Sequence, residues 1–233
     1  MSENHSSLET FWNDEVYCKG MQLNRYPHDI VVSFVFYNRP KEKPVGDTKI
    51  LEVGCGAGNN MWFTAREGFQ VTGVDLSPKA IDVAKKRLEE DGLSGDLHIG
   101  EFTDLPFESE SFDLAIDRAA ITCVGITAAK STIAEIHRVL KPKGKLLFNP
   151  YSKKNSSFLS GKTDSELLTR DMKSGPMTYI NQLCFYDEQG IRQLFSKGWD
   201  IISMKHAERI DIIEPDKGLF AEWQVVVERS ALG

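Results

Sequence analysis

Three glycines that alternate along the chain, together with an acidic residue farther on, are the residues best suited to chemistry. Gly54, Gly56 and Gly58 directly follow the apolar segment Ile50–Val53, and Asp75 ends a second apolar segment about twenty residues later. Glycine accepts positive φ angles and has no Cβ, so its backbone can contact a ligand directly. An acid at this spacing is placed to bind the two hydroxyls of a ribose. The pattern therefore predicts a site for a nucleoside-containing ligand.

The spacing of the glycines discriminates between the known nucleotide-binding turns. A phosphate-binding P-loop needs Lys followed by Ser or Thr, whereas Asn59 and Asn60 follow the glycines here. A dinucleotide-binding turn has the spacing G-x-G-x-x-G, and its third glycine would fall on Asn59. The observed pattern is E-x-G-x-G-x-G from Glu52 to Gly58. It excludes the P-loop and argues against a dinucleotide.

Alternating strand and helix patterns surround this turn and predict the scaffold that positions it. Strands are expected at 49–54, 70–74, 96–100, 112–117 and 145–149. Helices are expected at 58–67, 77–91 and 127–140, the second with Ser77 as its N-cap and Pro78 at its first position. Strands that alternate with helices form a doubly wound, mostly parallel α/β sheet, whose ligand crevice lies at the carboxyl ends of the strands.

The flanking segments predict one domain built around this core of residues 48–150. Residues 1–47 are expected to form an N-terminal helical cap, loose over 1–10 and with two helices between 11 and 37. Residues 151–184 are expected to form an insert or lid after the fifth strand. Residues 185–233 add a helix at 187–197, with Asp187 as N-cap, and two strands joined by the turn at 215–218. The predicted sheet therefore has seven strands and ends in an antiparallel hairpin.

Composition excludes several classes of protein. The 233 residues carry a net charge of −6, which argues against a nucleic-acid partner. No apolar run approaches the ~18 residues that a membrane span needs, and the N-terminus lacks the pattern of a secretory signal. The four cysteines, at 18, 55, 123 and 184, form no C-x-x-C pair. We therefore expect a cytoplasmic protein with reduced cysteines, no zinc site and no membrane partner.

Five sequence blocks in a fixed order extend the glycine pattern. They are Leu51–Gly58 (LEVGCGAG), Val71–Ser77 (VTGVDLS), Glu101–Phe107 (EFTDLPF), Ser111–Asp117 (SFDLAID) and Arg138–Lys145 (RVLKPKGK). With these blocks the chain resembles the class I S-adenosylmethionine-dependent methyltransferases, in detail over residues 45–150 and in element order to the C-terminus. The resemblance implies that the cofactor is S-adenosylmethionine.

The same resemblance implies roles for individual residues. It assigns cofactor binding to Glu52, Gly54, Cys55, Gly56, Asp75, Leu76, Glu101, Phe102, Asp117 and Arg118. Asp75 would bind the ribose hydroxyls, and Leu76 and Phe102 would flank the adenine. Position 101 is normally Asp, so the longer Glu101 departs from the family pattern. In the N-terminal cap, Arg25 is the candidate anchor for the cofactor's carboxylate, with Tyr17 or Tyr26 beside it.

Methyl transfer to a neutral nitrogen or oxygen releases a proton, so a base near the acceptor can assist it. Asp117 and Tyr151 are the candidate catalytic residues, and His28, Tyr179 and Tyr186 are further candidates for the base. For Asp117 the alternative is a structural role as a helix cap or as the ion-pair partner of Arg118. Neither a metal nor a nucleophilic triad is required.

The identity of the acceptor is the least constrained prediction. The polar 151–184 segment and the N-terminal cap favour a small polar molecule methylated on nitrogen or oxygen. The alternatives are a protein or tRNA methyltransferase, and a catalytically silent protein of the same fold that binds the cofactor. The expected assembly is a monomer or a homodimer.

Overall fold

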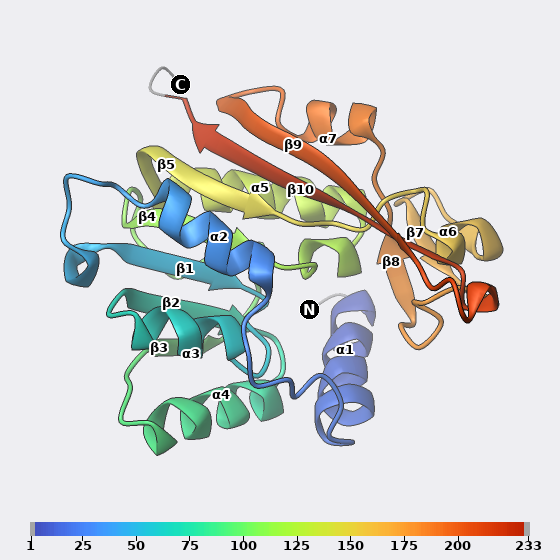
Figure 1. The fold of residues 1–233 in the computed structure, drawn as a ribbon, viewed down its shortest axis with the longest axis horizontal. Helices are drawn as coiled ribbons and strands as arrows, with labels where there is room; N and C mark the ends of the chain where they lie inside the picture. The colour runs from blue at the N-terminus through green and yellow to red at the C-terminus, as the bar shows by residue number, and fades with distance from the viewer. Residues whose placement is uncertain (1–2, 231–233) are drawn as a thin grey trace.

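The computed structural model describes residues 3–230, and its centre is one seven-stranded sheet (Figure 1). The strands lie in the order β3-β2-β1-β4-β5-β10-β9. Their bounds are β1 Lys49–Val53, β2 Gln70–Asp75, β3 Asp96–Ile99, β4 Phe112–Asp117, β5 Leu140–Phe148, β9 Trp199–Ile210 and β10 Leu219–Arg229. Strand β10 runs antiparallel to both β5 and β9, whereas the pairs β1–β2, β2–β3, β1–β4 and β4–β5 are parallel. The predicted fold is therefore confirmed.

Helices cover both faces of the sheet (Figure 1). On one face, α2 (Asp29–Asn38), α3 (Asn59–Arg66) and α4 (Pro78–Glu90) pack their apolar residues against the strands. On the other face, α5 (Ile126–Val139) and α7 (Glu188–Leu194) pack against β5 and β10. The expected N-caps are present: Ser77 Oγ accepts from Ala80 N at 3.1 Å, and Asp187 Oδ1 accepts from Gly190 N at 2.8 Å. Apolar residues on both faces of the sheet hold its strands in place.

The N-terminal segment differs from the predicted cap. Helix α2 is a layer of the core, because Val31, Phe34 and Val35 pack against Ile50 and Leu114 of the sheet. Only α1 (Glu3–Thr10), the π-helix η1 (Phe11–Tyr17) and the loop 18–28 remain as a cap. Residues 3–10 are helical rather than loose. The apolar stripe at 30–35 was a core signal, which the sequence pattern did not distinguish from a cap.

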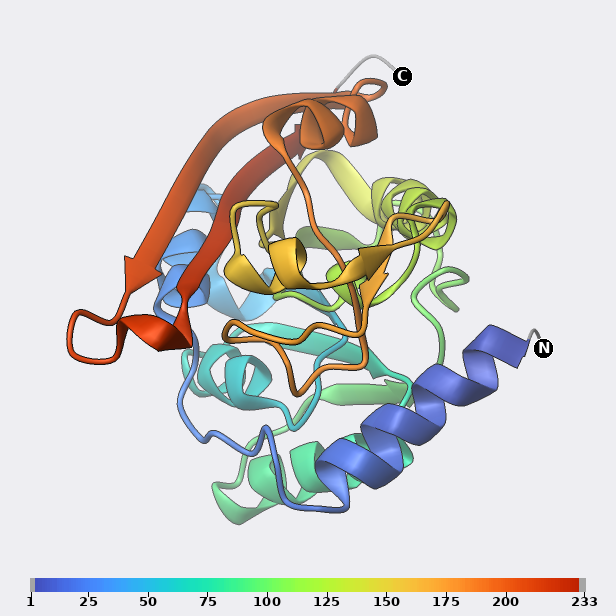
Figure 2. The ribbon, with the colours of Figure 1, turned by 90° about the vertical axis from the view of Figure 1, so that its right-hand side faces the viewer.

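The segment after β5 is ordered as a small separate sheet. Strands β6 (Lys162–Thr163), β7 (Leu168–Arg170) and β8 (Gln182–Cys184) form an antiparallel sheet, preceded by α6 (Ser156–Ser160). Figure 2 shows this insert beside the long β9–β10 hairpin, at the same end of the molecule as the loops that follow β1, β2 and β4. The short helices η2 (Val45–Asp47), η3 (Ile121–Cys123) and η4 (Pro215–Lys217) complete the chain. The carboxyl ends of the parallel strands are therefore covered by the cap, the insert and the hairpin.

Candidate active site

The glycine turn after β1 presents bare backbone to a cavity. Gly54 and Gly56 have φ values of +65° and +53°. A Cβ on Gly54 would lie 2.1 Å from Ala120 Cβ, and one on Gly56 would lie 2.5 Å from Tyr17 Oη. Neither position can therefore carry a side chain in this arrangement. The sequence prediction that glycine is needed here for close approach agrees with this geometry.

Asp75 lies at the end of β2 and faces the same turn. Its Oδ2 accepts a hydrogen bond from Gly56 N at 2.8 Å, and its Oδ1 accepts one from Ser77 N at 2.9 Å. Burial raises the pKa of this carboxyl, and the two backbone hydrogen bonds oppose that rise. Asp75 thus holds the turn closed and keeps carboxylate lone pairs for a ligand.

Glu52, on β1, is part of a buried hydrogen-bonded chain. Its Oε1 accepts from Asn60 Nδ2 at 2.7 Å, and Asn60 Oδ1 accepts from the backbone N–H of His28 at 3.0 Å. Burial raises the pKa of Glu52 to about 8, so its carboxyl group is mostly protonated at neutral pH. Its Oε2 is buried and has no hydrogen-bond partner among the described residues. A ligand in the cavity could pair with this oxygen.

These residues border a cavity of about 480 Å³. One part of its lining, which we call the glycine-turn side, comprises Glu52, Gly54, Cys55, Gly56, Ala57, Asn59, Asn60, Asp75, Leu76 and Phe102. The other part, which we call the closing side, comes from the cap and α2, from residues 118–123, from the insert and from the hairpin. It includes Leu8, Trp12, Tyr17, Gln22, Asn24, His28, Asp29, Ile30, Arg118, Ala119, Ala120, Cys123, Tyr151, Met177, Tyr179, Ile180, Leu183, Arg209, Phe220 and Glu222.

The π-helix η1 positions Tyr17 over the glycine turn. Its wider turn is closed by the hydrogen bond from Cys18 N to Asn13 O, at 2.8 Å. Asn13 Oδ1 in turn accepts from Ser77 Oγ at 3.0 Å and from Lys79 N at 3.1 Å, at the start of α4. Tyr17 is buried, and burial next to the charge of Asp75 raises the pKa of its hydroxyl well above the usual value. The cap is therefore fixed to the core beside the site.

Three charged side chains meet on the closing side. Arg118 Nη2 lies 3.8 Å from Glu222 Oε2, and Arg209 Nη2 lies 3.9 Å from Glu222 Oε1. His28 also lines this side, and burial together with the positive charges of Arg118 and Arg209 lowers its pKa to about 4. The imidazole of His28 is consequently neutral at physiological pH and is a weak base that can accept a hydrogen bond. By contrast, burial raises the pKa of the Tyr151 hydroxyl, which disfavours the phenolate.

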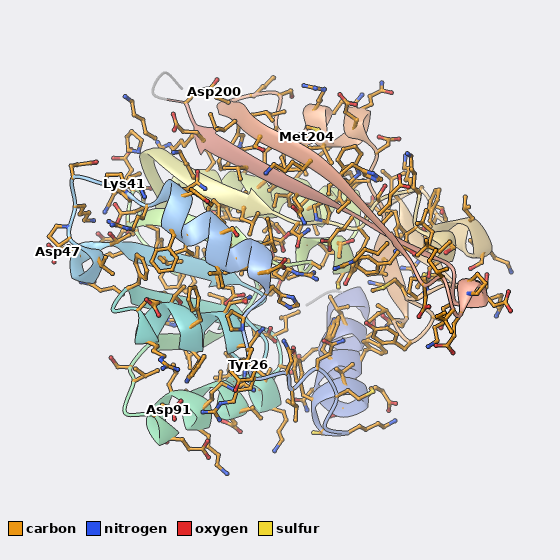
Figure 3. The ribbon with its side chains drawn as sticks, in the orientation of Figure 1. Tyr26, Lys41, Asp47, Asp91, Asp200 and Met204 are labelled. Carbon is orange, nitrogen blue, oxygen red and sulfur yellow. The ribbon has the colours of Figure 1, made fainter. Side chains whose placement is uncertain are left out.

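Several predicted site residues lie elsewhere. Arg25 Nη2 forms an ion pair with Asp91 Oδ2 at 2.8 Å and lies outside the cavity lining, so it does not occupy the position of a carboxylate anchor. Tyr26 is 71% exposed and packs against Trp62; Figure 3 labels Tyr26 and Asp91 on the α3–α4 side of the molecule. Glu101 lies outside the main cavity and borders a shallower hollow with Leu76.

Asp117 has the capping role that the sequence left open as its alternative. The side chain is fully buried, and its Oδ1 accepts from Ala120 N and Ile121 N, both at 2.9 Å, at the start of η3. It is absent from the cavity lining, as is the buried Tyr186, whereas Tyr151, His28 and Tyr179 are present. Asp117 Oδ1 therefore holds Ala120 against Gly54, and the side chain does not border the cavity. Burial raises the pKa of Asp117 to about 6.

Sequence reasoning missed the contributions of the hairpin. Arg209, Phe220 and Glu222 lie on strands outside the five sequence blocks, and charges on a strand give no signal of their own. Asn59 and Asn60, by contrast, were detectable from the sequence, because they follow the glycine turn directly.

A second arrangement of catalytic residue types lies outside the cavity. Ser152 Oγ is 2.7 Å from His206 Nε2, and His206 Nδ1 is 3.2 Å from Glu208 Oε1. Ser152 is only 2% exposed and is absent from the cavity lining, so no substrate can reach its hydroxyl. The chain of contacts instead ties the start of the insert to β9. It is a structural link and not a hydrolytic triad.

Comparison with known proteins identifies the domain around the glycine turn. A family model described as a methyltransferase domain matches residues 50–144. The uncharacterized methyltransferase YodH of Bacillus subtilis (strain 168) is 36% identical over 107 residues, which are 46% of this chain and 45% of YodH. A ubiquinone biosynthesis O-methyltransferase of Xanthomonas axonopodis pv. citri (strain 306) is 30% identical over 148 residues, 61% of this chain and 59% of that protein. The chain spans about half the length of the curated relatives that it matches.

Solved structures match nearly the whole fold. An S-adenosylmethionine-dependent methyltransferase from Methanosarcina mazei aligns with a TM-score of 0.69 and 20% identity, over 88% of this chain and 99% of that one. The 1,6-didemethyltoxoflavin-N1-methyltransferase of Burkholderia thailandensis, solved with S-adenosylhomocysteine, aligns with a TM-score of 0.59 and 17% identity, over 86% and 76%. Another match, at a TM-score of 0.63 and 18% identity over 87% and 80%, is the [4+2]-cyclase SpnF, so the fold alone does not fix the reaction. Residues 50–144 are therefore similar to a methyltransferase domain, and the chain shares the fold of solved S-adenosylmethionine-dependent methyltransferases.

Proposed function

We propose that the protein transfers a methyl group from S-adenosylmethionine to a nitrogen or oxygen atom of a small polar molecule. The observation that carries this proposal is the single cavity onto which both sides open. Its glycine-turn side offers bare backbone and a carboxylate, and its closing side offers polar, charged and aromatic side chains. A cofactor and an acceptor bound in one cavity would be held close together, which removes much of the entropic barrier to their reaction.

The glycine-turn side fits the cofactor chemically. Gly54 and Gly56 border the cavity with backbone alone, because Ala120 and Tyr17 leave no room for a Cβ, and Asp75 offers its carboxylate to ribose hydroxyls. Leu76 and Phe102 supply apolar surface for a base, and the unpaired buried Oε2 of Glu52 is suited to a polar group of the cofactor. When bound, S-adenosylmethionine would supply the methyl group and the leaving group. The chain's own task is binding, orientation and exclusion of water.

The closing side supplies the remaining tasks. The neutral imidazole of His28 can accept a hydrogen bond from an acceptor hydroxyl or amine and so orient it in the cavity. Trp12, Met177 and Ile180, from the cap and the insert, exclude water from the cavity. The proposal gives no catalytic role to Asp117, whose Oδ1 caps η3, and no cofactor contact to Arg25, which is paired with Asp91. Tyr151 lines the cavity, and its proposed role is to contact the acceptor and not to act as a base.

A methyl-transfer screen tests the proposal. Small amines, phenols, sugars and carboxylated hydroxy compounds are incubated with the protein and S-adenosylmethionine, and formation of S-adenosylhomocysteine is measured. Turnover of at least one compound is expected, together with its loss in the variant Asp75→Ala. Transfer to protein or tRNA substrates but to no small molecule would contradict the proposed acceptor class. Binding of the cofactor without any transfer would favour the silent cofactor-binding protein.

A further inference from the structure

Two arginines and one glutamate define a charged subsite on the closing side. Arg118 follows β4, and Arg209 lies near the end of β9, yet both guanidinium groups approach the carboxylate of Glu222. We propose that Arg118 and Arg209 bind a single carboxylate group of the acceptor. The assignment rests on the proposed function, because it names the acceptor class for the same cavity.

The contacts within this subsite leave hydrogen-bonding groups unsatisfied. The distances of 3.8 Å and 3.9 Å from the two arginines to Glu222 are about 1 Å longer than those of paired guanidinium and carboxylate groups. Arg118 Nε and Glu222 Oε2 are both buried and have no hydrogen-bond partner within residues 3–230. A buried donor without an acceptor is costly, and a carboxylate that enters the cavity would supply the acceptor that Arg118 Nε lacks.

The local charge favours one negative charge over two. Two arginines and one glutamate leave one net positive charge, and the side chains of Arg118 and Glu222 are only 15% and 6% exposed. The neighbouring His28 is neutral, because its pKa lies at about 4, and Glu52, whose pKa is about 8, is mostly protonated. A carboxylate therefore neutralises the group formed by Arg118, Arg209 and Glu222, while Asp29, which also lines the closing side, disfavours a second negative charge. A dianionic phosphate would leave a net negative charge near the buried Glu222.

Apolar surface beside the arginines indicates the shape of the rest of the acceptor. The Arg209 guanidinium carbon lies 4.5 Å from the ring centroid of Phe220, and the ring of Phe220 lies 5.8 Å from that of Tyr151. Both aromatic residues line the cavity. A flat apolar body with a carboxylate at one end would pack on these rings while its charge reached the arginines.

The hairpin that carries Arg209 is fixed to the rest of the molecule. His206 forms a hydrogen bond with Ser152, and its ring packs on Trp223. The Nε1 of Trp223 in turn donates a hydrogen bond to the carbonyl oxygen of Tyr186 at 2.9 Å. Residue 222 also forms a β-bridge with Tyr151. The base of the hairpin is therefore held against the insert, so the charged subsite is organised before an acceptor binds.

Titration with a matched pair of probes tests the assignment. Benzoate and its uncharged analogue benzamide are added to the full chain, with and without S-adenosylhomocysteine, up to about 50 mM, a range that covers millimolar affinities. Binding is measured by calorimetry and by the NMR signals of the arginine Nε–H groups. We expect benzoate to bind at least about tenfold more tightly than benzamide, because it alone pairs with both guanidinium groups. Phenyl phosphate at pH 8 is expected to bind more weakly than benzoate.

Three variants test which side chains cause the preference for benzoate over benzamide. Arg209→Gln and Arg118→Gln are each expected to reduce the benzoate preference about tenfold. Lys205→Gln, which removes a positive charge from the same strand but outside the cavity lining, is expected to leave it unchanged. Equal binding of the two probes, no binding of benzoate, or a preference that survives both arginine changes would overturn the assignment. Tighter binding of phenyl phosphate would overturn the choice of a monoanion.

The two proposals can fail separately. A protein that binds S-adenosylhomocysteine but does not discriminate benzoate from benzamide would contradict only the carboxylate subsite. A protein that does not bind S-adenosylhomocysteine would contradict the proposed function, and the titration without it would still report on Arg118 and Arg209.

Discussion

The two sides of the cavity are built in different ways. The glycine-turn side comes from a short stretch of chain, Glu52–Asn60, and from residues at or near the ends of the neighbouring strands, and much of what it offers is backbone. The closing side is assembled from side chains of the cap, the insert and the hairpin, and the cap is more than a hundred residues from the other two in the sequence. Backbone geometry requires particular residue types, whereas a wall of side chains can change without loss of the fold. The first side therefore coincides largely with the five sequence blocks, whereas the second lies outside them.

The largest expected effect tests whether the glycine-turn side depends on bare backbone. Gly54→Ala places a Cβ 2.1 Å from Ala120 Cβ at a φ of +65°, so we expect loss of S-adenosylhomocysteine binding and a fall of about 3 kcal/mol or more in the free energy of unfolding. Gly92→Ala is the matched control, because its φ is +66° and nothing lies within 4 Å of the new Cβ. We expect it to cost only about 1–2 kcal/mol. Calorimetry and denaturant unfolding measure both effects, and equal losses would show that the clash is unimportant.

The next largest effect tests Asp75, the charged side chain of the glycine-turn side. Asp75→Ala removes the carboxylate proposed to bind the ribose, and we expect the affinity for S-adenosylhomocysteine to fall about tenfold to a hundredfold. Asp82→Ala, on the exposed surface of α4, should leave the affinity unchanged. Circular dichroism checks that the fold persists. Unchanged affinity in Asp75→Ala would mean that the ribose contact is misassigned.

A smaller effect concerns stability and its dependence on pH. Burial raises the pKa of Glu52 from 4.5 to about 8, so between these values the folded protein binds more protons than the unfolded chain. Stability from this group is fully present below pH 4.5 and is lost as the pH rises through 8. We expect Glu52→Gln to remove this loss, on the order of a few kcal/mol, and to flatten the unfolding free energy measured between pH 5 and 9. Glu67→Gln, on the surface, should keep the slope of the parent.

The smallest expected effect sharpens the boundary of the closing side. Arg25 is paired with Asp91 outside the cavity, so Arg25→Gln should change the affinity for S-adenosylhomocysteine less than about twofold, in keeping with the small energies of exposed ion pairs. The measurement is the same calorimetric titration. A fall of tenfold would show that the cap rearranges on binding and brings Arg25 to the cofactor.

The fold was predictable because its signals are local and periodic. The five strands of residues 48–150, their helices and the Ser77 and Asp187 caps were all expected from apolar alternation and capping residues. Neither the position of α2 in the core nor the capping contact of Asp117 was predictable in the same way. An apolar helix packs equally well as a core layer or as a cap, and an acid at a strand end can cap a turn or face a ligand. Only the tertiary contacts of Val31 and of Asp117 Oδ1 decide between these alternatives.

The closing side was largely hidden for a physical reason. Arg209 and Glu222 are brought together by the pairing of β9 with β10, in which Ala207 lies opposite Glu222. Neither residue stands out from the other charges of the hairpin in the sequence. Long-range register therefore creates the charged subsite, and local patterns cannot reveal it.

Calorimetric titration of S-adenosylhomocysteine into the unmodified protein tests the central claim most directly. We expect one molecule to bind per chain with a Kd below about 100 µM, which corresponds to roughly 5 kcal/mol or more of binding free energy. Gly92→Ala should bind equally well, and Gly54→Ala should not bind. The absence of binding by the unmodified protein at several times that concentration, on the order of 500 µM, would contradict the assignment of the glycine-turn side to the cofactor.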